Sequence, residues 1–250
     1  MSETKRLEFT SGVIGYPIAL VLSMWIVFWA EIRFHLDFNY LGVYPQKIEG
    51  LRGILFAPFI HSNLQHLFNN SVPLLVLTAA LFYFYKNIRW KVLMFGLLFT
   101  GFATWLIGRP ALHIGASGMV YMLVSFLFFK GIFSKQFQLT ALSLVVVFLY
   151  GGLLWYVFPI DPKISWEGHL SGFGVGFLFS LWFKEIPVEN KKYYWEKEDY
   201  DPQEDEFLKH FDDDGNFIES KPELPDSDND AKIEIRYTFK RNKDKLDDQS

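Results

Sequence analysis

The sequence predicts an all-α membrane protein with six transmembrane helices and an acidic C-terminal tail. Half of the 250 residues are hydrophobic and 19% are aromatic, although 21% are charged. The two kinds of residue are segregated, because residues 187–250 hold 20 of the 28 acidic and 11 of the 24 basic residues. The tail therefore carries a net charge of −9 and the preceding body one of +5. Apolar runs long enough to cross about 30 Å of hydrocarbon recur along that body.

Six apolar runs are the expected transmembrane helices. They cover residues 13–30, 65–85, 90–108, 117–133, 139–157 and 165–183. The first run could be mistaken for a signal peptide, but it is long and no small-residue cleavage motif follows it, so we expect it to be retained. The connections after the second to fifth helices are short, which makes those neighbours antiparallel. Residues 31–63 form a long, partly apolar loop that is expected to pack at the membrane interface.

The distribution of Lys and Arg predicts the orientation and the domain boundaries. Ten of these residues flank one side of the expected spans and five flank the other, which places both termini in the cytoplasm. We therefore expect a cytoplasmic N-terminal segment (1–12), a membrane domain (13–185) and an acidic cytoplasmic tail (186–250), in a bacterial inner membrane.

Most of the acidic tail is expected to be solvated and flexible. Residues 232–240 alternate in polarity and are a candidate strand. Trp195, Phe207 and Phe211 are candidate docking residues in the same tail. The tail is a candidate recruiting or regulatory segment, and its deletion without effect on activity or stability would end that idea.

Several classes of function are excluded or disfavoured by the residues that the chain lacks. The chain contains no cysteine, which excludes disulfides, thiolate metal sites and cysteine nucleophiles. It has no nucleotide-binding glycine pattern, nucleic-acid motif or fixed-period repeat. We expect no metal, no cofactor and no nucleic-acid partner, and the oligomeric state stays open.

Polar side chains at the ends of the apolar runs are the strongest functional signal, because such groups are costly in lipid. A single histidine there is more often structural than catalytic. The spacing changes this balance, since His66 and Asn70 lie four residues apart and share one helix face. Ser117 and Tyr121 repeat the same spacing at the start of the fourth expected helix.

The sixth expected helix carries a histidine on a face of small residues. Gly172 and Gly176 follow His169 at positions i+3 and i+7. Small residues at this spacing permit close approach of a second helix backbone. Packing alone requires the glycines but not the histidine.

The fourth expected helix is short. From Ser117 to Lys130 it spans about 20 Å, against a hydrocarbon core of about 30 Å. A helix that ends at the cytoplasmic surface therefore begins below the outer surface. Irregular backbone at that depth is tolerated where it lines a wet cavity. We expect Ser117 to lie at the bottom of a water-filled pocket.

A serine in such a pocket is a candidate nucleophile. It requires a base within hydrogen-bond reach and donors for the developing oxyanion. His169 is the candidate base. The free N–H groups at the start of a helix, together with Asn70 and His66, are candidate oxyanion donors.

The candidate base has no acidic partner in the expected spans. Glu167 lies two residues before His169, and residues two apart on a helix do not face each other. The sequence therefore favours a dyad over a triad, with Tyr121 as a candidate to orient the imidazole by stacking.

Three separated motifs resemble those of the rhomboid family of intramembrane serine proteases, and the resemblance covers residues 10–185. In the family's order, they are His61-x4-His66-x3-Asn70, then Gly115-Ala116-Ser117-Gly118 with Tyr121, then Gly168-His169-x2-Gly172-x3-Gly176. One departure is that Leu51-Arg52 stands near the place where the family often has a Trp-Arg pair.

The resemblance implies a role for each motif residue. Ser117 would be the nucleophile and His169 the general base and then acid. Asn70, His66 and the Ser117 N–H would form the oxyanion hole. Tyr121 would pack on His169, and His61 would structure the first loop. Substrates would be transmembrane helices of other proteins, cut near their outer ends after entry between the second and fifth helices.

Three other readings compete with a protease. Relatives that lack the dyad bind transmembrane clients without cutting them, but both dyad residues are present here. A transporter or channel predicts deeper ionisable groups and internal symmetry, and neither is apparent. A packing motif explains Gly115 and Gly118 but leaves the histidines and Asn70 unexplained.

Overall fold

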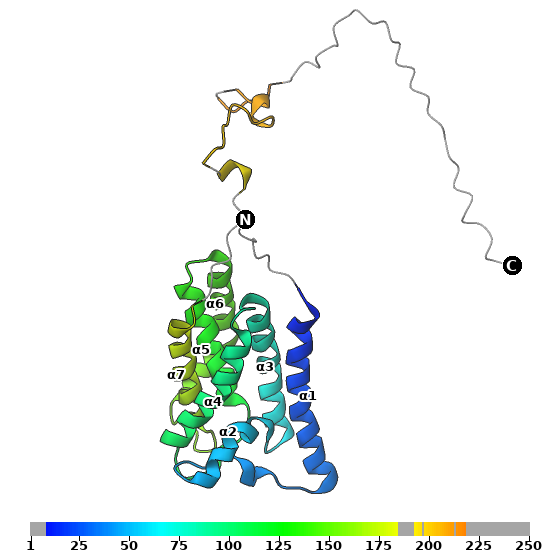
Figure 1. Ribbon diagram of the computed structural model, residues 1–250, viewed down its shortest axis with the longest axis vertical. Helices are drawn as coiled ribbons and strands as arrows, with labels where there is room; N and C mark the ends of the chain where they lie inside the picture. The colour runs from blue at the N-terminus through cyan, green and yellow to red at the C-terminus, as the bar shows by residue number, and fades with distance from the viewer. Residues whose placement is uncertain (1–8, 185–192, 197, 213, 219–250) are drawn as a thin grey trace, which may run out of the picture. The chain divides into compact units, whose positions relative to one another are not determined.

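A computed structural model describes residues 9–184, 193–196, 198–212 and 214–218, and the regular elements in these ranges are all helical. The chain divides into two units, Met1–Asn190 and Lys191–Ser250. The first contains the long helices in Figure 1: α1 (Ser11–Phe34), α3 (Leu64–Phe84), α4 (Arg89–Ile107), α5 (Ser117–Phe133), α6 (Phe137–Tyr150) and α7 (Trp166–Trp182).

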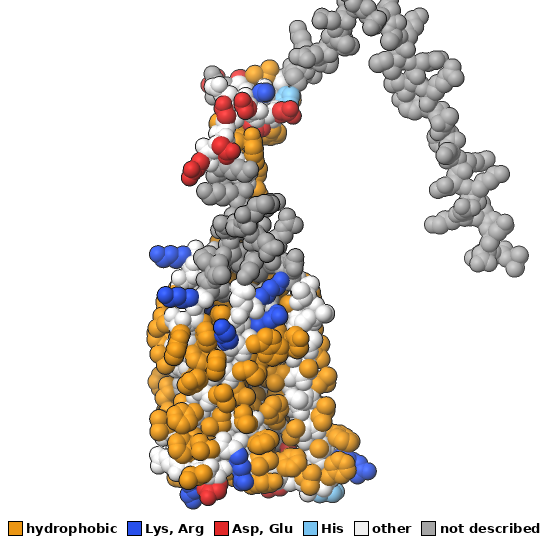
Figure 2. Space-filling view, viewed as in Figure 1, with side chains coloured by type: hydrophobic (Ala, Val, Ile, Leu, Met, Phe, Trp, Pro, Cys, Tyr) orange, Lys and Arg blue, Asp and Glu red, His pale blue; other side chains and the backbone are white. Residues whose placement is uncertain are grey.

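The first unit has the apolar exterior of a membrane domain. Within residues 9–184, four segments are long and apolar enough to cross a membrane, namely α1, α3, α4 and the stretch Phe137–Val157, and α5 is a shorter apolar helix. Exposed hydrophobic side chains cover the side of this unit, whereas Lys and Arg gather toward its two ends (Figure 2). The all-helical membrane fold is thus confirmed, while a count of six crossings stays a prediction.

The helix α5 lies at the centre of the first unit (Figure 1). It contacts α3, α4, α6 and α7, and every residue from Met119 to Leu127 is buried. An apolar sequence without a polar face is typical of a helix that is covered on all sides. The central position fixes the first residue of α5, Ser117, against several neighbouring elements.

The seam between α5 and α7 depends on glycine. A Cβ atom at Gly172 would collide with the carbonyl oxygen of Gly118, and one at Gly176 would collide with that of Met122. The Ser125 hydroxyl, which is fully buried, donates a hydrogen bond of 2.7 Å to the Phe173 carbonyl across the same seam. Small residues therefore let the backbones of α5 and α7 approach closely.

The long loop before α3 contains four short helices: η1 (Asn39–Leu41), η2 (Ile48–Arg52), α2 (Gly53–Phe56) and η3 (Ala57–Phe59). Val43 and His113 exchange two backbone hydrogen bonds of 2.9 Å, which join this loop to the segment before α5. Arg52 donates to the Tyr40 carbonyl at 2.8 Å and lies over the Tyr40 ring. Arg52 therefore stabilises this loop by contacts with another residue of the same loop.

Two of the helices differ from the expected ranges. The first continues to Phe34 because helical backbone does not stop where the apolar run ends, and His35 then closes it in a left-handed conformation with φ of 54°. The fifth expected helix is α-helical only to Tyr150, and Gly151–Val157 forms a 3-10 helix, η4. The apolar pattern of the sequence does not distinguish an α-helix from a 3-10 helix, because the same types of residue occur in both.

The second unit is described for residues 193–196, 198–212 and 214–218. It contains η5 (Tyr194–Glu196) and η6 (Leu208–His210), and a bridge joins Phe211 to Phe217. The ring of Phe211 lies 5.2 Å from that of Phe207, and Trp195 stacks on Tyr193 at 4.7 Å. The candidate docking aromatics thus contact other aromatics of the same unit. The candidate strand at 232–240 lies outside the described residues.

Candidate active site

The start of α3 positions two of the predicted oxyanion donors. Asn63 adopts an extended backbone and its side chain accepts a hydrogen bond of 2.8 Å from the His66 N–H, which caps the helix. One turn later, the Asn70 amide donates to the His66 carbonyl at 3.0 Å. The cap and the turn fix His66 and Asn70 one above the other on the same face of α3.

Gly115 lies directly against both of these side chains. Its φ of 97° is in the left-handed region, and its N–H donates to the Ala57 carbonyl at 2.8 Å. A Cβ atom here would lie 2.6 Å from His66 Nε2 and 3.6 Å from Asn70 Nδ2. Glycine is therefore required both by the backbone conformation and by the space that the two side chains occupy.

Ser117 is the first residue of α5 and lies in a turn with free donors. The N-cap residue, Ala116, has no side chain that can accept a hydrogen bond. Its carbonyl accepts from the N–H groups of Met119 and Val120 at 2.9 and 3.1 Å. The N–H groups of Ser117 and Gly118 lack a carbonyl within the helix, which makes this end favourable for negative charge.

His169 is held in a defined orientation near the start of α7. Its Nδ1 lies 2.9 Å from the Tyr156 carbonyl oxygen. Because a carbonyl only accepts, Nδ1 carries the proton and Nε2 has a free lone pair. The Tyr121 ring stacks on the imidazole, with the centroids 4.0 Å apart and the planes 10° from parallel. The Tyr121 hydroxyl donates to the Leu153 carbonyl at 2.8 Å.

One cavity of about 870 Å³ brings the predicted residues together. The residues Ser117, His169, His66, Asn70 and Tyr121 all line it. Leu153 and Tyr156 of η4, whose carbonyls accept from Tyr121 and His169, line it as well. The cavity has room for several water molecules and a peptide segment.

The remaining predicted residues lie around this cavity rather than in its wall. His61 is buried, and its ring centre lies 5.0 Å from that of His66. Gly115 and Gly118 line a second cavity of about 50 Å³. Gly172 and Gly176 belong to the seam between α5 and α7. These residues therefore support the site from outside.

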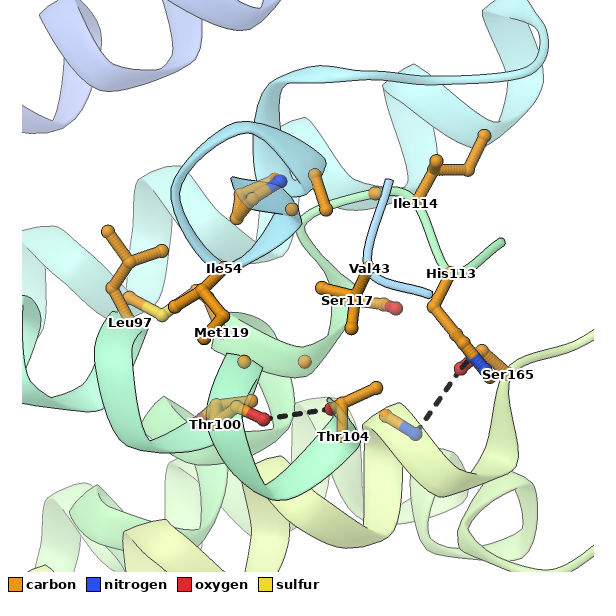
Figure 3. Close-up of a pocket in the computed structure, with 17 residues that line it drawn as sticks. Val43, Ile54, Leu97, Thr100, Thr104, His113, Ile114, Ser117, Met119 and Ser165 are labelled. Carbon is orange, nitrogen blue, oxygen red and sulfur yellow. Dashed lines mark hydrogen bonds between the residues drawn. The ribbon is translucent and has the colours of Figure 1, made fainter. Parts of the chain in front are cut away.

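The second cavity adjoins Ser117 from within the helix bundle. Thr100 and Thr104 of α4 line it together with Ser117, His113 and Ser165 (Figure 3). The Thr104 hydroxyl donates to the Thr100 carbonyl at 2.8 Å. Ser117, His113 and Ser165 line both cavities, so the two cavities adjoin at these residues.

Ser117 and His169 are not hydrogen-bonded to each other in the described part of the chain. Hydrogen bonds between catalytic groups are often long without substrate and tighten when substrate binds. The arrangement therefore places the candidate nucleophile and the oriented candidate base in one cavity.

A hydrogen-bonded network around His113 was not predicted from the sequence. His113 Nδ1 lies 2.6 Å from the Ser165 hydroxyl, and its Nε2 lies 3.1 Å from the Arg109 carbonyl. Ser165 in turn caps α7 by accepting from the Gly168 N–H at 3.3 Å. Burial lowers the pKa of His113, although the hydrogen bond to the Arg109 carbonyl opposes this effect. His113 thus joins the segment that carries Ser117 to the helix that carries His169 (Figure 3).

Glu167 lies in this same region and pairs with Arg109. It is buried, and one of its carboxylate oxygens lies 3.7 Å from Arg109 Nε. Arg109 also donates to the carbonyls of Pro162 and Ile164 at 2.8 and 2.9 Å. The Glu167 carboxylate, at the start of α7, therefore offsets the charge of Arg109, which lies in the loop before α5.

The fold and the site define an all-helical integral membrane protein with a polar cavity built from several helices. The rhomboid domain family matches residues 49–185, which is more than half of the chain. The chain belongs to the rhomboid family. This family generally contains intramembrane serine proteases.

Curated relatives of this chain come from mycobacteria. Uncharacterized proteins of Mycobacterium bovis and Mycobacterium tuberculosis are 39% identical over 151 residues, which is 55% of this chain and 60% of each relative. An uncharacterized protein of Mycobacterium leprae is 40% identical over 187 residues, or 67% of this chain and 70% of the relative. The chain thus spans about 60% of the length of the first two relatives.

Proposed function

We propose that this protein is an intramembrane serine protease that hydrolyses peptide bonds in or near transmembrane helices of other proteins. The observation that carries the proposal is the state of His169. Its Nδ1–H is held by the Tyr156 carbonyl and its ring by Tyr121. Its Nε2 lone pair is free in the cavity that Ser117 also lines.

The chemistry follows from these positions. As Ser117 Oγ attacks the scissile carbonyl carbon, His169 Nε2 takes the hydroxyl proton. The oxyanion accepts hydrogen bonds from the Ser117 N–H and from the side chains of Asn70 and His66. His169 then gives its proton to the departing amine, which leaves an acyl ester on Ser117. Water from the cavity attacks the ester while His169 acts again as base.

The proposal includes the arrangement of the protein in the membrane. Six crossings, formed by α1, α3, α4, α5, α6 with η4, and α7, suit a bacterial inner membrane with both termini in the cytoplasm. The short α5 then begins below the outer surface, because 17 residues span about 25 Å against a core of about 30 Å. A substrate helix enters between α3 and α6.

The test compares the wild type with variants that lack the Ser117 hydroxyl or the His169 imidazole. Purified protein in liposomes is mixed with a panel of fluorescent transmembrane-helix substrates. Ser117→Ala and His169→Ala are expected to lower the cleavage rate by about 10⁴-fold or more, because nucleophile and base act as a unit. Gly15→Ala is the control, since a Cβ there meets nothing within 4 Å. Equal rates for wild type and both variants would contradict a serine protease.

A catalytically silent protein that binds transmembrane clients is the second candidate. The observation that favours it is that no hydrogen bond joins Ser117 to His169 within residues 9–184. This candidate predicts client binding that Ser117→Ala leaves unchanged and no cleavage by the wild type. Co-purification of a tagged substrate with both proteins separates the two candidates.

A further inference from the structure

The second unit exposes an aromatic surface that its described residues do not cover. This surface consists of Phe207, Phe211 and Phe217, and the rings of Phe207 and Phe217 are centred 5.2 and 5.8 Å from that of Phe211. Phe207 and Phe217 are 69% and 67% exposed, and none of the residues between 193 and 218 whose burial the structure describes is buried. Units of fewer than about 40 residues rarely bury enough apolar area to be stable without further support. The aromatic surface therefore needs a cover.

A strand edge lies within the aromatic surface. Two backbone hydrogen bonds, of 2.7 and 2.9 Å, flank the antiparallel bridge between Phe211 and Phe217. In such a pair the two opposed residues direct their own N–H and C=O groups to the outer edges. The Phe211 N–H already donates to the Leu208 carbonyl at 3.0 Å. The edge at Phe217 is therefore the side on which a further strand can pair.

The charge of the unit favours a basic cover. Residues 193–218 contain ten acidic residues and two basic ones. Figure 2 shows acidic side chains beside hydrophobic ones on the visible face of this unit. Such a negative field attracts a basic partner and repels an anionic one, such as an anionic lipid headgroup. The cover should therefore be both apolar and basic.

A segment with these two properties follows in the same chain. In residues 232–240, which lie outside the described residues, the apolar side chains occupy positions 233, 235, 237 and 239. Because a strand places alternate residues on one face, this spacing gives one apolar face and one polar face. The polar positions carry three basic residues and one acidic residue. Only 13 residues, 219–231, separate the segment from the described unit, and a short tether gives an effective concentration on the order of millimolar.

We propose that residues 232–240 pair as a strand with the edge at Phe217 and cover the aromatic surface with their apolar face. Main-chain hydrogen bonds supply the affinity, and the alternating apolar side chains set the register. The basic residues lie in the negative field of the unit, which strengthens the contact at low salt. The second unit is thereby completed by a C-terminal segment of its own chain, and its strand edge is closed to other chains.

The test is amide hydrogen exchange, followed by mass spectrometry, on the full chain in an uncharged detergent. We expect the amides of residues 233–239 to exchange at least tenfold more slowly than in an unstructured peptide of the same sequence. Ile235→Gln is expected to abolish this protection, because it places a polar amide on the apolar face. Thr238→Gln introduces the same side chain on the opposite face, so this matched control should keep the protection within twofold of wild type.

Charge variants identify the surface to which the segment binds. Glu204→Lys/Glu206→Lys changes two exposed side chains close to Phe207 in the sequence, and we expect it to reduce the protection at least fivefold at low salt. Asp247→Lys/Asp248→Lys changes the net charge of the chain by the same amount and is expected to reduce the protection less than twofold.

Three results would overturn the proposal. The first is exchange of residues 233–239 in the wild type at the rate of the unstructured peptide. The second is protection on which the two glutamine variants, or the two charge variants, have equal effects, since the segment would then bind another surface. The third is protection that appears only in liposomes with anionic lipid, which would assign the segment to a membrane surface.

Discussion

At the scale of single residues, His169 is oriented by backbone rather than by an acidic side chain. A carbonyl acceptor at 2.9 Å fixes which ring nitrogen is protonated, as a triad aspartate would. It does so without placing a second charge in the membrane, where an isolated carboxylate is costly. The stacked ring of Tyr121 restricts the remaining freedom of the imidazole.

Replacement of His113 tests the connection between the segment that carries Ser117 and the helix that carries His169. We expect His113→Ala to lower activity by tenfold or more, because it removes the hydrogen bond between His113 and Ser165 and that to the Arg109 carbonyl. The free energy of unfolding should fall by about 1–3 kcal/mol for the same reason. Cleavage kinetics and thermal unfolding in detergent measure the two effects.

His113→Gln is the matched variant, since glutamine keeps one donor and one acceptor. We expect it to recover most of the stability and part of the activity. If His113→Ala matched the wild type in both measurements, the network would have no part in holding the site together.

At the scale of elements, the packing of α7 on α5 sets the separation of Ser117 and His169. A Cβ atom at Gly172 would collide with the Gly118 carbonyl, whereas one at Gly174 would meet nothing within 4 Å. Both glycines lie in α7, so an alanine at either position changes helix propensity alike. Only the alanine at position 172 also disturbs the contact with α5.

Gly172→Ala is expected to destabilise the fold by about 1–3 kcal/mol and to reduce cleavage strongly, because the two helices must move apart. Gly174→Ala is expected to leave activity within twofold of wild type. Thermal unfolding and cleavage rates of both variants check this. Similar losses for the two would mean that the seam does not control the site.

The elements also show what the sequence can and cannot predict. Its apolar runs predicted the ends of the long helices to within a few residues, including α5 at residues 117–133, except that α6 ends at Tyr150 and not at residue 157. The motifs predicted which side chains share a cavity, because helical spacing places them on known faces. The roles of the Leu153 and Tyr156 carbonyls could not be predicted from the sequence, because every residue has a carbonyl group. Only the 3-10 geometry of η4 directs these two toward Tyr121 and His169. His113 was missed because its partners lie more than 50 residues away in Ser165 or on the backbone.

At the scale of the whole molecule, the burial of histidines makes the stability of the fold depend on pH. Burial, and then the nearby His66, lower the pKa of His61 to about 4, from about 6.5 in an unfolded chain. Between these values the unfolded chain binds a proton that the folded protein excludes. The contribution of His61 to stability is therefore complete above about pH 6.5 and is lost as the pH drops toward 4. The lowered pKa of His113 acts in the same direction.

Thermal unfolding in detergent from pH 4 to pH 7 measures this dependence. We expect the unfolding temperature to fall with pH in the wild type and to fall less in His61→Gln, which has no proton to take up. Salt concentration and detergent are held fixed, so that only the histidine differs. An identical pH profile for the two proteins would show that His61 does not contribute.

The most direct test of the central claim is to locate the adduct of a fluorophosphonate by mass spectrometry in the purified full-length protein. We predict a single serine adduct at Ser117, formed rapidly in the wild type and at least a hundredfold more slowly in His169→Ala. Such a result requires both a reactive hydroxyl and the base that activates it. An unmodified Ser117, or labelling at the same rate without His169, would contradict a Ser117–His169 dyad.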